Sequence, residues 1–182
     1  LCVVVGLPTP LLPIHLLWIN LVTDGLPALC LATDPIDSDV MRRHPRHPSE
    51  RITNRSFLRT MGLTGFLTAG VAFAVYLYVL KTKTGTTETA RTYAFTVLVF
   101  AELLRSFGAR SSTKPVWRIS VFTNRNLLIV VALSFGLQVW SQHSPTLGRF
   151  LKTSSMPFAH CLWLLALGTI PLFVLELLKL YT

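Results

Sequence analysis

Charged residues are scarce in this chain. Asp, Glu, Lys and Arg make up only 14% of its 182 residues, whereas hydrophobic residues make up 51%. Soluble domains usually contain about 25% charged residues, and the mean hydropathy of this chain is +0.53. The composition therefore excludes an ordinary soluble domain and indicates that lipid surrounds much of the chain.

Motifs of soluble catalysis and of cofactor binding are absent as well. The sequence contains no glycine-rich phosphate loop, no Ser-His-Asp set and no Cys-His pair. We therefore expect no catalytic or cofactor-binding residue and no hydrolysis of ATP by this chain alone. Cys2, Cys30 and Cys161 lie in apolar surroundings without Cys-x-x-Cys spacing. Neither a zinc site nor a disulfide framework is indicated, and we interpret these cysteines as packing residues.

Acidic residues are outnumbered, at 8 against 17 Lys and Arg, which gives a net charge of +9. A nucleic-acid-binding protein usually gathers its basic residues on one soluble face, whereas here they lie between long apolar runs. We therefore expect no nucleic-acid partner. Membrane topology explains the charge better, because cytoplasmic loops hold an excess of Lys and Arg.

Long apolar stretches predict an all-α fold, a polytopic transmembrane helix bundle. A spanning helix needs about 20 mainly apolar residues to cross the hydrocarbon core. Five stretches fit this length, namely Pro13–Ala32, Ser56–Leu80, Ala90–Phe107, Arg125–Ser141 and Phe158–Leu180. The uncharged part of the fourth stretch, Leu127–Trp140, has a length at which a buried or re-entrant helix is an alternative.

The distribution of basic residues predicts the orientation of these spans. If the loop after the first span is cytoplasmic, that side of the membrane holds twelve Lys and Arg residues and the opposite side holds five. The twelve are Arg42, Arg43, Arg46, Arg51, Arg55, Arg59, Arg105, Arg110, Lys114, Arg118, Arg125 and Lys179; the five are Lys81, Lys83, Arg91, Arg149 and Lys152. We therefore expect a cytoplasmic carboxyl terminus.

The segments on either side of the first span differ in character. The apolar run Leu1–Gly6 lacks an initiating Met and a signal-peptide pattern, so we interpret it as the stump of a preceding helix in a longer protein. After the span, the charged segment Thr33–Asn54 is interrupted by prolines, which predicts a cytoplasmic loop rather than a long helix. This loop either docks on a soluble domain or is only a solvated connector.

The first span contains the strongest candidate site. Asp24 lies near mid-span, where an unpartnered carboxylate costs at least about 2.5 kcal/mol. Helical spacing places the Asn20 amide, the Thr23 hydroxyl and the Asp24 carboxylate on one face. This all-oxygen cluster suits a hard cation such as calcium. The alternative is that Asp24 pairs with a basic group, although the span itself contains no Lys or Arg.

Gly25 and Pro27 predict a local break in the same helix. Glycine weakens a helix, and Pro27 removes the amide that would bond to the carbonyl of Thr23. Unwound backbone at membrane depth is tolerated where protein buries it or where it lines a cavity, and broken helices supply ion sites in many transporters. We therefore expect backbone oxygens to join the site. The alternative is a simple kink.

Two further acids lie within or at the ends of apolar stretches. Glu102 is either a cation ligand that completes the site across helices or the partner of Arg105, three residues further along the helix. Glu176 and Lys179 have the same spacing near the end of the last span. For that second pair we favour a structural ion pair.

The stretch from Gly6 to Ala28, GLPTPLLPIHLLWINLVTDGLPA, closely resembles the sixth transmembrane helix of P-type cation ATPases. The resemblance continues through Asp34–Pro48, Glu102–Ser111 and Phe122–Leu127, and it covers essentially the whole chain. It is strongest in the first third of the sequence. Within the family, the chain is most similar to bacterial calcium-type pumps.

This resemblance implies that residues 1–182 form the carboxyl-terminal transmembrane transport domain of such a pump, from the end of helix five through helix ten. Asn20, Thr23 and Asp24 match ion ligands of the family, and Glu102 matches a ligand of helix eight. The transported cation would be Ca2+. Cytoplasmic domains outside this chain would use ATP and Mg2+ and dock through the segment from Asp34 to Arg51.

Several alternatives stay open. Sodium, manganese or proton exchange would share the helix-six motif, and a stand-alone membrane remnant or a regulatory or binding subunit would lack ATPase activity altogether. A secondary transporter would be expected to show a repeat of spans, and the sequence contains none. We expect an integral, multi-pass protein of the bacterial cytoplasmic membrane.

Overall fold

The computed structural model describes residues 2, 6–35, 53, 55–82, 86–111 and 114–181. These residues form helices and turns, and no β-strand occurs among them. The elements are α1 (Pro13–Trp18), the π-helix η1 (Ile19–Gly25), α2 (Leu26–Ala32), α3 (Arg55–Lys81), α4 (Thr87–Gly108), the short 3-10 helices η3 (Val116–Arg118) and η4 (Val121–Thr123), α5 (Arg125–His143), α6 (Pro145–Leu151) and α7 (Phe158–Tyr181). The predicted all-α bundle is therefore confirmed.

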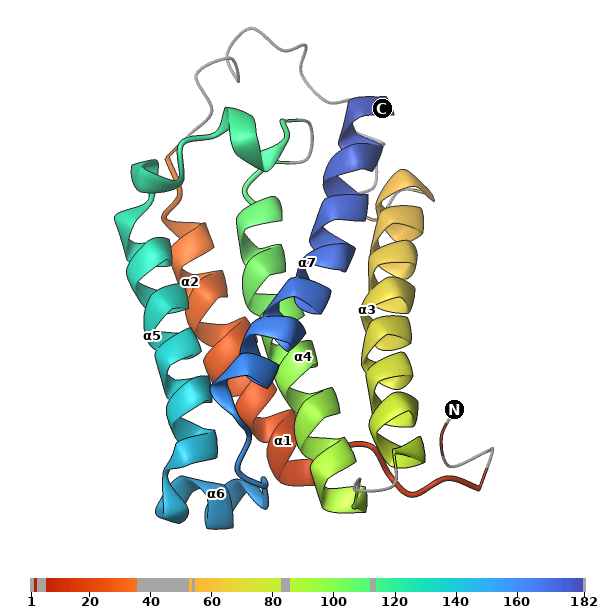
Figure 1. Ribbon diagram of the computed structural model, residues 1–182. Coiled ribbons are helices and arrows are strands. Elements are labelled where there is room, and N and C mark those ends of the chain that lie inside the picture. The colour runs from red at the N-terminus through yellow and green to blue at the C-terminus, as the bar shows by residue number, and fades with distance from the viewer. Residues whose placement is uncertain are drawn as a thin grey trace, which may run out of the picture.

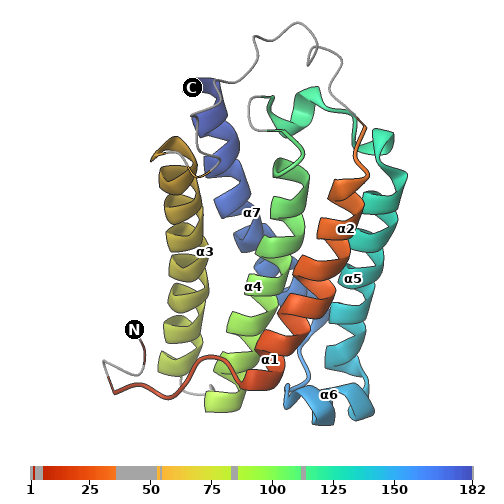
Figure 2. The ribbon, with the colours of Figure 1, turned by 180° about the vertical axis from the view of Figure 1, so that it is seen from behind.

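The long helices run side by side as a bundle with α4 near its centre (Figure 1). The continuous series α1–η1–α2 and α5 lie on one side of α4 and α3 lies on the other, while α7 crosses α4 obliquely and ends beside α3, as the view from behind also shows (Figure 2). The carboxyl ends of α2, α4 and α7 lie at one end of the bundle, together with the amino ends of α3 and α5. The short helix α6 turns across the opposite end.

The predicted spans correspond to helices whose ends agree with the sequence-based ranges to within one helical turn. By length and composition, however, only three of the described helical stretches could cross a membrane, namely Pro13–Ala32, Phe57–Lys81 and Phe158–Leu180. A fourth span is obtained if α5 and α6, bent by 94° at their junction, are counted together. This differs from the five predicted spans, and the helices that fall short are α4 and α5.

Charged residues interrupt the apolar run of α4, and polar residues make α5 less apolar. The bundle accommodates the polar residues of both helices. Gln142 Nε2 donates to the Thr96 hydroxyl of α4 at 2.5 Å, and Gln138 Oε1 accepts from the Trp18 indole at 3.0 Å. Thr96 and Gln138 are fully buried. Because these polar groups find partners on neighbouring helices, α4 and α5 need not be as apolar as helices that face lipid.

The hydrophobic core is centred on α4. Tyr76 of α3 and Phe95, Phe100 and Leu103 of α4 are the largest of its fully buried apolar residues, and α4 is buried along most of its length. The ring of His15, near the start of the first span, stacks on Phe95 with ring centroids 4.4 Å apart. The first span is thus packed directly against the central helix, which is the arrangement that forms the candidate site.

Two sequence interpretations lie largely outside the described residues. In the run Leu1–Gly6, which we interpreted as the end of a preceding helix, the structure describes only Cys2 and Gly6. In the interpreted docking loop, it describes residues 33–35 and 53. The cysteine interpretation does lie within the described part of the chain. Cys2, Cys30 and Cys161 are all free, and two of them are buried, as packing residues should be.

Candidate cation site

The middle of the first span is a π-helix, η1, with α-helix on both sides. The sequence predicted unwound backbone at Gly25 and Pro27, and that prediction is wrong in form, because the helix is widened rather than broken. Pro27 lies in the first turn of α2, where a missing amide is tolerated. Single π-helical turns inside α-helices occur frequently at functional sites.

Side-chain hydroxyls bond to carbonyls of this widened segment. The Thr23 hydroxyl donates to the Ile19 carbonyl at 2.5 Å, and the Ser134 hydroxyl of α5 donates to the Val22 carbonyl at 3.0 Å. Both hydroxyl-bearing residues are buried. The sequence analysis did not identify Ser134, whose only signal was a polar residue inside an otherwise apolar stretch.

Gly25 ends the π-helix at a position where a side chain would be in tight contact with the backbone. A Cβ atom built on Gly25 would lie 3.0 Å from the backbone carbonyl oxygen of Asn20. That distance is shorter than ordinary van der Waals contact, and the contacting atom belongs to the backbone rather than to a flexible side chain. A side chain at this position would therefore require the π-helical turn to shift by a few tenths of an ångström.

An open cavity of about 260 Å³ lies beside η1, between the first span and α4. It is lined by Thr23, Asp24, Pro27, Ala28, Leu31, Glu102, Arg105, Ser106 and Ala109. The cavity brings together three of the four predicted ligands. Asn20 does not line it and has an exposed side chain.

Asp24 is the acid in this cavity without a hydrogen bond or ion pair to any described residue, although Arg105, which lines the same cavity, attracts it electrostatically. Its side chain is exposed, and the structure records no hydrogen bond or ion pair to its carboxylate among the described residues. The alternative that Asp24 forms an ion pair is therefore not supported there. Thr23, by contrast, is buried, and its hydroxyl already donates to a backbone carbonyl. Its remaining oxygen lone pairs can still accept or coordinate.

Glu102 forms an ion pair with Arg105 on the same face of α4. The Glu102 side chain is 14% exposed and the Arg105 side chain is 40% exposed, so both reach the cavity. This contact is the structural alternative considered for Glu102. It does not exclude a ligand role, because a carboxylate that holds an arginine still has acceptor positions free.

Within the described ranges, no group of three or more His, Cys, Asp or Glu side chains is arranged to hold a metal ion. Calcium usually takes six to eight oxygen ligands. The cavity supplies the carboxylates of Asp24 and Glu102 and the hydroxyl of Thr23. These three groups, which come from both sides of the cavity, are fewer than a complete calcium coordination shell requires.

A family model described as "Cation transporting ATPase, C-terminus" matches residues 8–181 of this chain. The chain belongs to this family. It is the carboxyl-terminal membrane region of a P-type cation-transporting ATPase, as the resemblance of its first span implied.

Relatives of this ATPase region include calcium-transporting ATPases of bacteria and animals. "Calcium-transporting ATPase 1" of Bacillus cereus is 36% identical over 197 residues, which cover 99% of this chain and 22% of that protein. "Calcium-transporting ATPase type 2C member 2" of Mus musculus is 34% identical over 182 residues, which cover 100% of this chain and 19% of that protein. The chain therefore spans about a fifth of the length of the curated relatives it matches.

Proposed function

We propose that this chain is the membrane part of an ATP-driven calcium pump and that it supplies oxygen ligands to the ion-translocation site. The observation that carries the proposal is the Asp24 carboxylate, which forms no ion pair with a described residue and lines a cavity beside a π-helix together with Thr23 and Glu102. A carboxylate at membrane depth is costly without a partner. A bound divalent cation would provide that partner.

The site would be completed by groups outside this chain. The relatives that the chain matches are about five times longer, so their remaining parts can supply further ligands as well as the domains that use ATP and Mg2+. Asn20 belongs to the proposed ligand set through its place on the same π-helix, although it lies outside the cavity. The names of the relatives support calcium as the transported ion.

The proposed membrane placement follows from the charge bias. The cytoplasmic side would be the end of the bundle that carries the carboxyl terminus, which also holds Arg110, Arg125 and Lys179 (Figure 1). The docking segment Asp34–Arg51 would contact the phosphorylation domain on that side. The membrane would be a bacterial cytoplasmic membrane, in keeping with the bacterial relatives.

The direct test uses the full-length protein that contains this chain, purified and reconstituted in lipid vesicles. We expect ATP to phosphorylate it only when calcium is present, and calcium to enter vesicles whose pump domains face outward. Sodium and manganese are the comparison ions. Phosphorylation that calcium does not activate would contradict the proposal, and activation by one of the other ions would reassign the cargo.

Glu102→Gln tests whether the α4 carboxylate is a ligand. We expect the calcium concentration for half-maximal phosphorylation to rise by about tenfold, because the loss of one charged ligand weakens a hard-cation site. This rise in the half-maximal calcium concentration should be smaller than the rise caused by Asp24→Asn, since Arg105 already neutralises part of the Glu102 charge. If both the apparent affinity and the number of ions transported per ATP stay unchanged, Glu102 is only the partner of Arg105.

Gly25→Ala tests whether the π-helix shapes the site. The new methyl group would press on the Asn20 carbonyl and, at a cost of about 1–3 kcal/mol, force the turn to shift. We expect a roughly tenfold or greater rise in the half-activating calcium concentration, measured by phosphorylation from ATP.

Gly70→Ala is the matched control for this substitution, because a Cβ at Gly70 in α3 meets no atom within 4 Å. It should leave the calcium dependence at the wild-type value. If Gly25→Ala and Gly70→Ala behave alike, the π-helix has no role in ion binding.

A further inference from the structure

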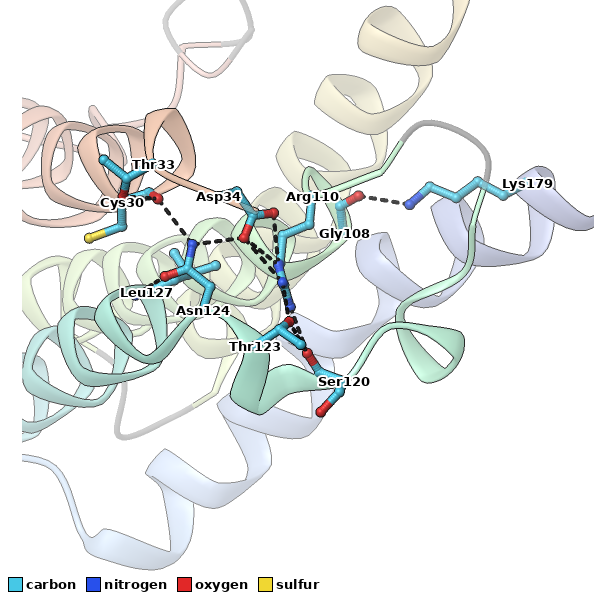
Figure 3. A network of polar contacts seen from close by, with 10 residues as sticks. All are labelled: Cys30, Thr33, Asp34, Gly108, Arg110, Ser120, Thr123, Asn124, Leu127 and Lys179. Atoms are coloured by element: carbon cyan, nitrogen blue, oxygen red, sulfur yellow. Dashed lines mark hydrogen bonds and ion pairs between the residues drawn. The ribbon is translucent and has the colours of Figure 1, made fainter. Parts of the chain in front are cut away.

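A polar cluster lies at the end of the bundle where the first span leaves it (Figure 3). Arg110, just beyond α4, donates from Nε to Asp34 Oδ2 at 3.1 Å and from Nη2 to Asp34 Oδ1 at 3.1 Å. The Arg110 side chain is only 5% exposed and that of Asp34 is 16% exposed. Two-point contact of this kind suits the planar guanidinium of arginine and not the ammonium group of lysine.

Arg110 also holds the connection between α4 and α5. Its Nη1 donates to the Ser120 carbonyl at 3.0 Å, and its Nη2 donates to the Thr123 hydroxyl at 2.6 Å. One buried guanidinium therefore joins the residue that follows α2 to the residues that precede α5 (Figure 3).

Asn124 completes the cluster from the start of α5. Its Nδ2 donates to Asp34 Oδ1 at 2.8 Å and to the Cys30 carbonyl at 3.0 Å. Its Oδ1 accepts from the Leu127 amide at 2.9 Å and so caps α5. Asn124 is 5% exposed. A single side chain thus fastens the last turn of α2 to the first turn of α5.

The cluster adjoins the cavity that contains the candidate ligands. Ala109, which lines the cavity, directly precedes Arg110, and Leu31, which also lines it, lies one helical turn before Asp34. Asp34 follows Asp24 by ten residues, and the short helix α2 lies between them. A shift of the end of α2 would therefore be passed along a short helix to the ion-site carboxylate.

We propose that Asp34, Arg110 and Asn124 are positioning residues for the ion site, which fix the end of α2 against α4 and α5. They thereby set where the Asp24 carboxylate lies relative to the α4 wall of the cavity. This inference rests on the proposed function. It assigns to the cluster a role in ion affinity. A cluster that only stabilised the fold would not affect ion affinity.

The first test measures ion affinity apart from the maximal rate. In the full-length protein, Arg110→Gln should raise the half-activating calcium concentration for phosphorylation by roughly tenfold, within the range common for coupled sites, and leave most of the maximal phosphorylation. Asp34→Asn should give a similar shift. The double variant should shift no further than either single variant, because residues in one network are not additive.

Arg118→Gln is the matched control, since Arg118 is an exposed arginine in the same connection. It should leave the calcium dependence unchanged. If Arg110→Gln and Asp34→Asn lower the melting temperature but keep the wild-type half-activating calcium concentration, the cluster only stabilises the fold and the inference is overturned.

A second readout does not depend on transport. Spin labels on Ala28→Cys and Ala109→Cys, in a protein whose native cysteines are replaced by alanine, report the distance across the cavity. Arg110→Gln should shift or broaden that distance, and Arg118→Gln should not. An unchanged distance in Arg110→Gln would overturn the inference. Insensitivity of the wild-type protein to calcium is a separate outcome, and it would contradict only the proposed function.

Discussion

Asp24→Asn should abolish calcium-dependent phosphorylation from ATP in the full-length protein, or raise the half-activating calcium concentration by about two orders of magnitude. The substitution keeps the size of the side chain and removes its charge, so the packing of η1 should not change. Asp24 has the strongest claim to a ligand role because its carboxylate lines the cavity and forms no hydrogen bond or ion pair with a described residue. The measurement is phosphoenzyme formation across a calcium series.

Glu88→Gln provides the matched control for this prediction. Glu88 is an exposed acid in the first turn of α4. This turn lies at the opposite end of the bundle from the Asp34–Arg110 pair (Figure 1). Its neutralisation should leave calcium dependence at the wild-type value. A wild-type calcium response in Asp24→Asn would remove the site assignment, because no other unpaired acid lines the cavity among the described residues.

The helices themselves could be predicted from the sequence, because apolar runs long enough to cross a bilayer determine where each begins and ends. Even α4 and α5, whose composition is less apolar, have ends within one turn of the predicted ones. What the apolar pattern did not reveal is how their polar residues are satisfied. The hydrogen bond between Gln142 and Thr96 joins residues 46 positions apart, and nothing in the local sequence pairs them.

The candidate site was predictable in its place and not in its form. Asp24 was identified because a carboxylate inside an apolar run is costly, and that argument needs only the sequence. The π-helix was not predicted, because Gly25 and Pro27 indicate only that the regular hydrogen-bond pattern fails nearby. Which pattern replaces it depends on distant partners such as the Ser134 hydroxyl, which bonds to the Val22 carbonyl.

The ion pairs of Glu102 and Glu176 show what the spacing of charged residues can predict and what it cannot. Both acids have a basic residue three positions later, and both ion pairs are present in the structure. Their surroundings differ, however, because Glu102 lines the open cavity whereas the Glu176 side chain is 2% exposed and lies outside it. Spacing favoured the pair of Glu176 with Lys179 and gave the pair of Glu102 with Arg105 as one of two alternatives. It could not distinguish a group in a site from a group in the protein interior.

Glu176→Ala should destabilise the bundle by about 3–5 kcal/mol, the usual cost of removing one partner from a buried ion pair. Glu176 Oε1 accepts from Lys179 Nζ at 2.8 Å, and its Oε2 accepts from the Val116 amide at 2.7 Å. Lys179 also donates to the Gly108 carbonyl at 2.7 Å (Figure 3). Removal of the carboxylate leaves a buried ammonium group without its counter-ion and the Val116 amide without its acceptor. Thermal unfolding in detergent measures the effect.

A double variant separates the ion pair from simple loss of packing. Glu176→Leu combined with Lys179→Met removes both charges, and such replacements are often close to neutral in stability. We therefore expect the double variant to unfold well above the temperature of Glu176→Ala. Gly108 shows why the helices are sensitive here, since an added Cβ would lie 2.8 Å from Leu172 Cδ1 and 2.9 Å from Glu176 Oε1. If Glu176→Ala melts at the wild-type temperature, the pair of Glu176 and Lys179 does not stabilise the bundle.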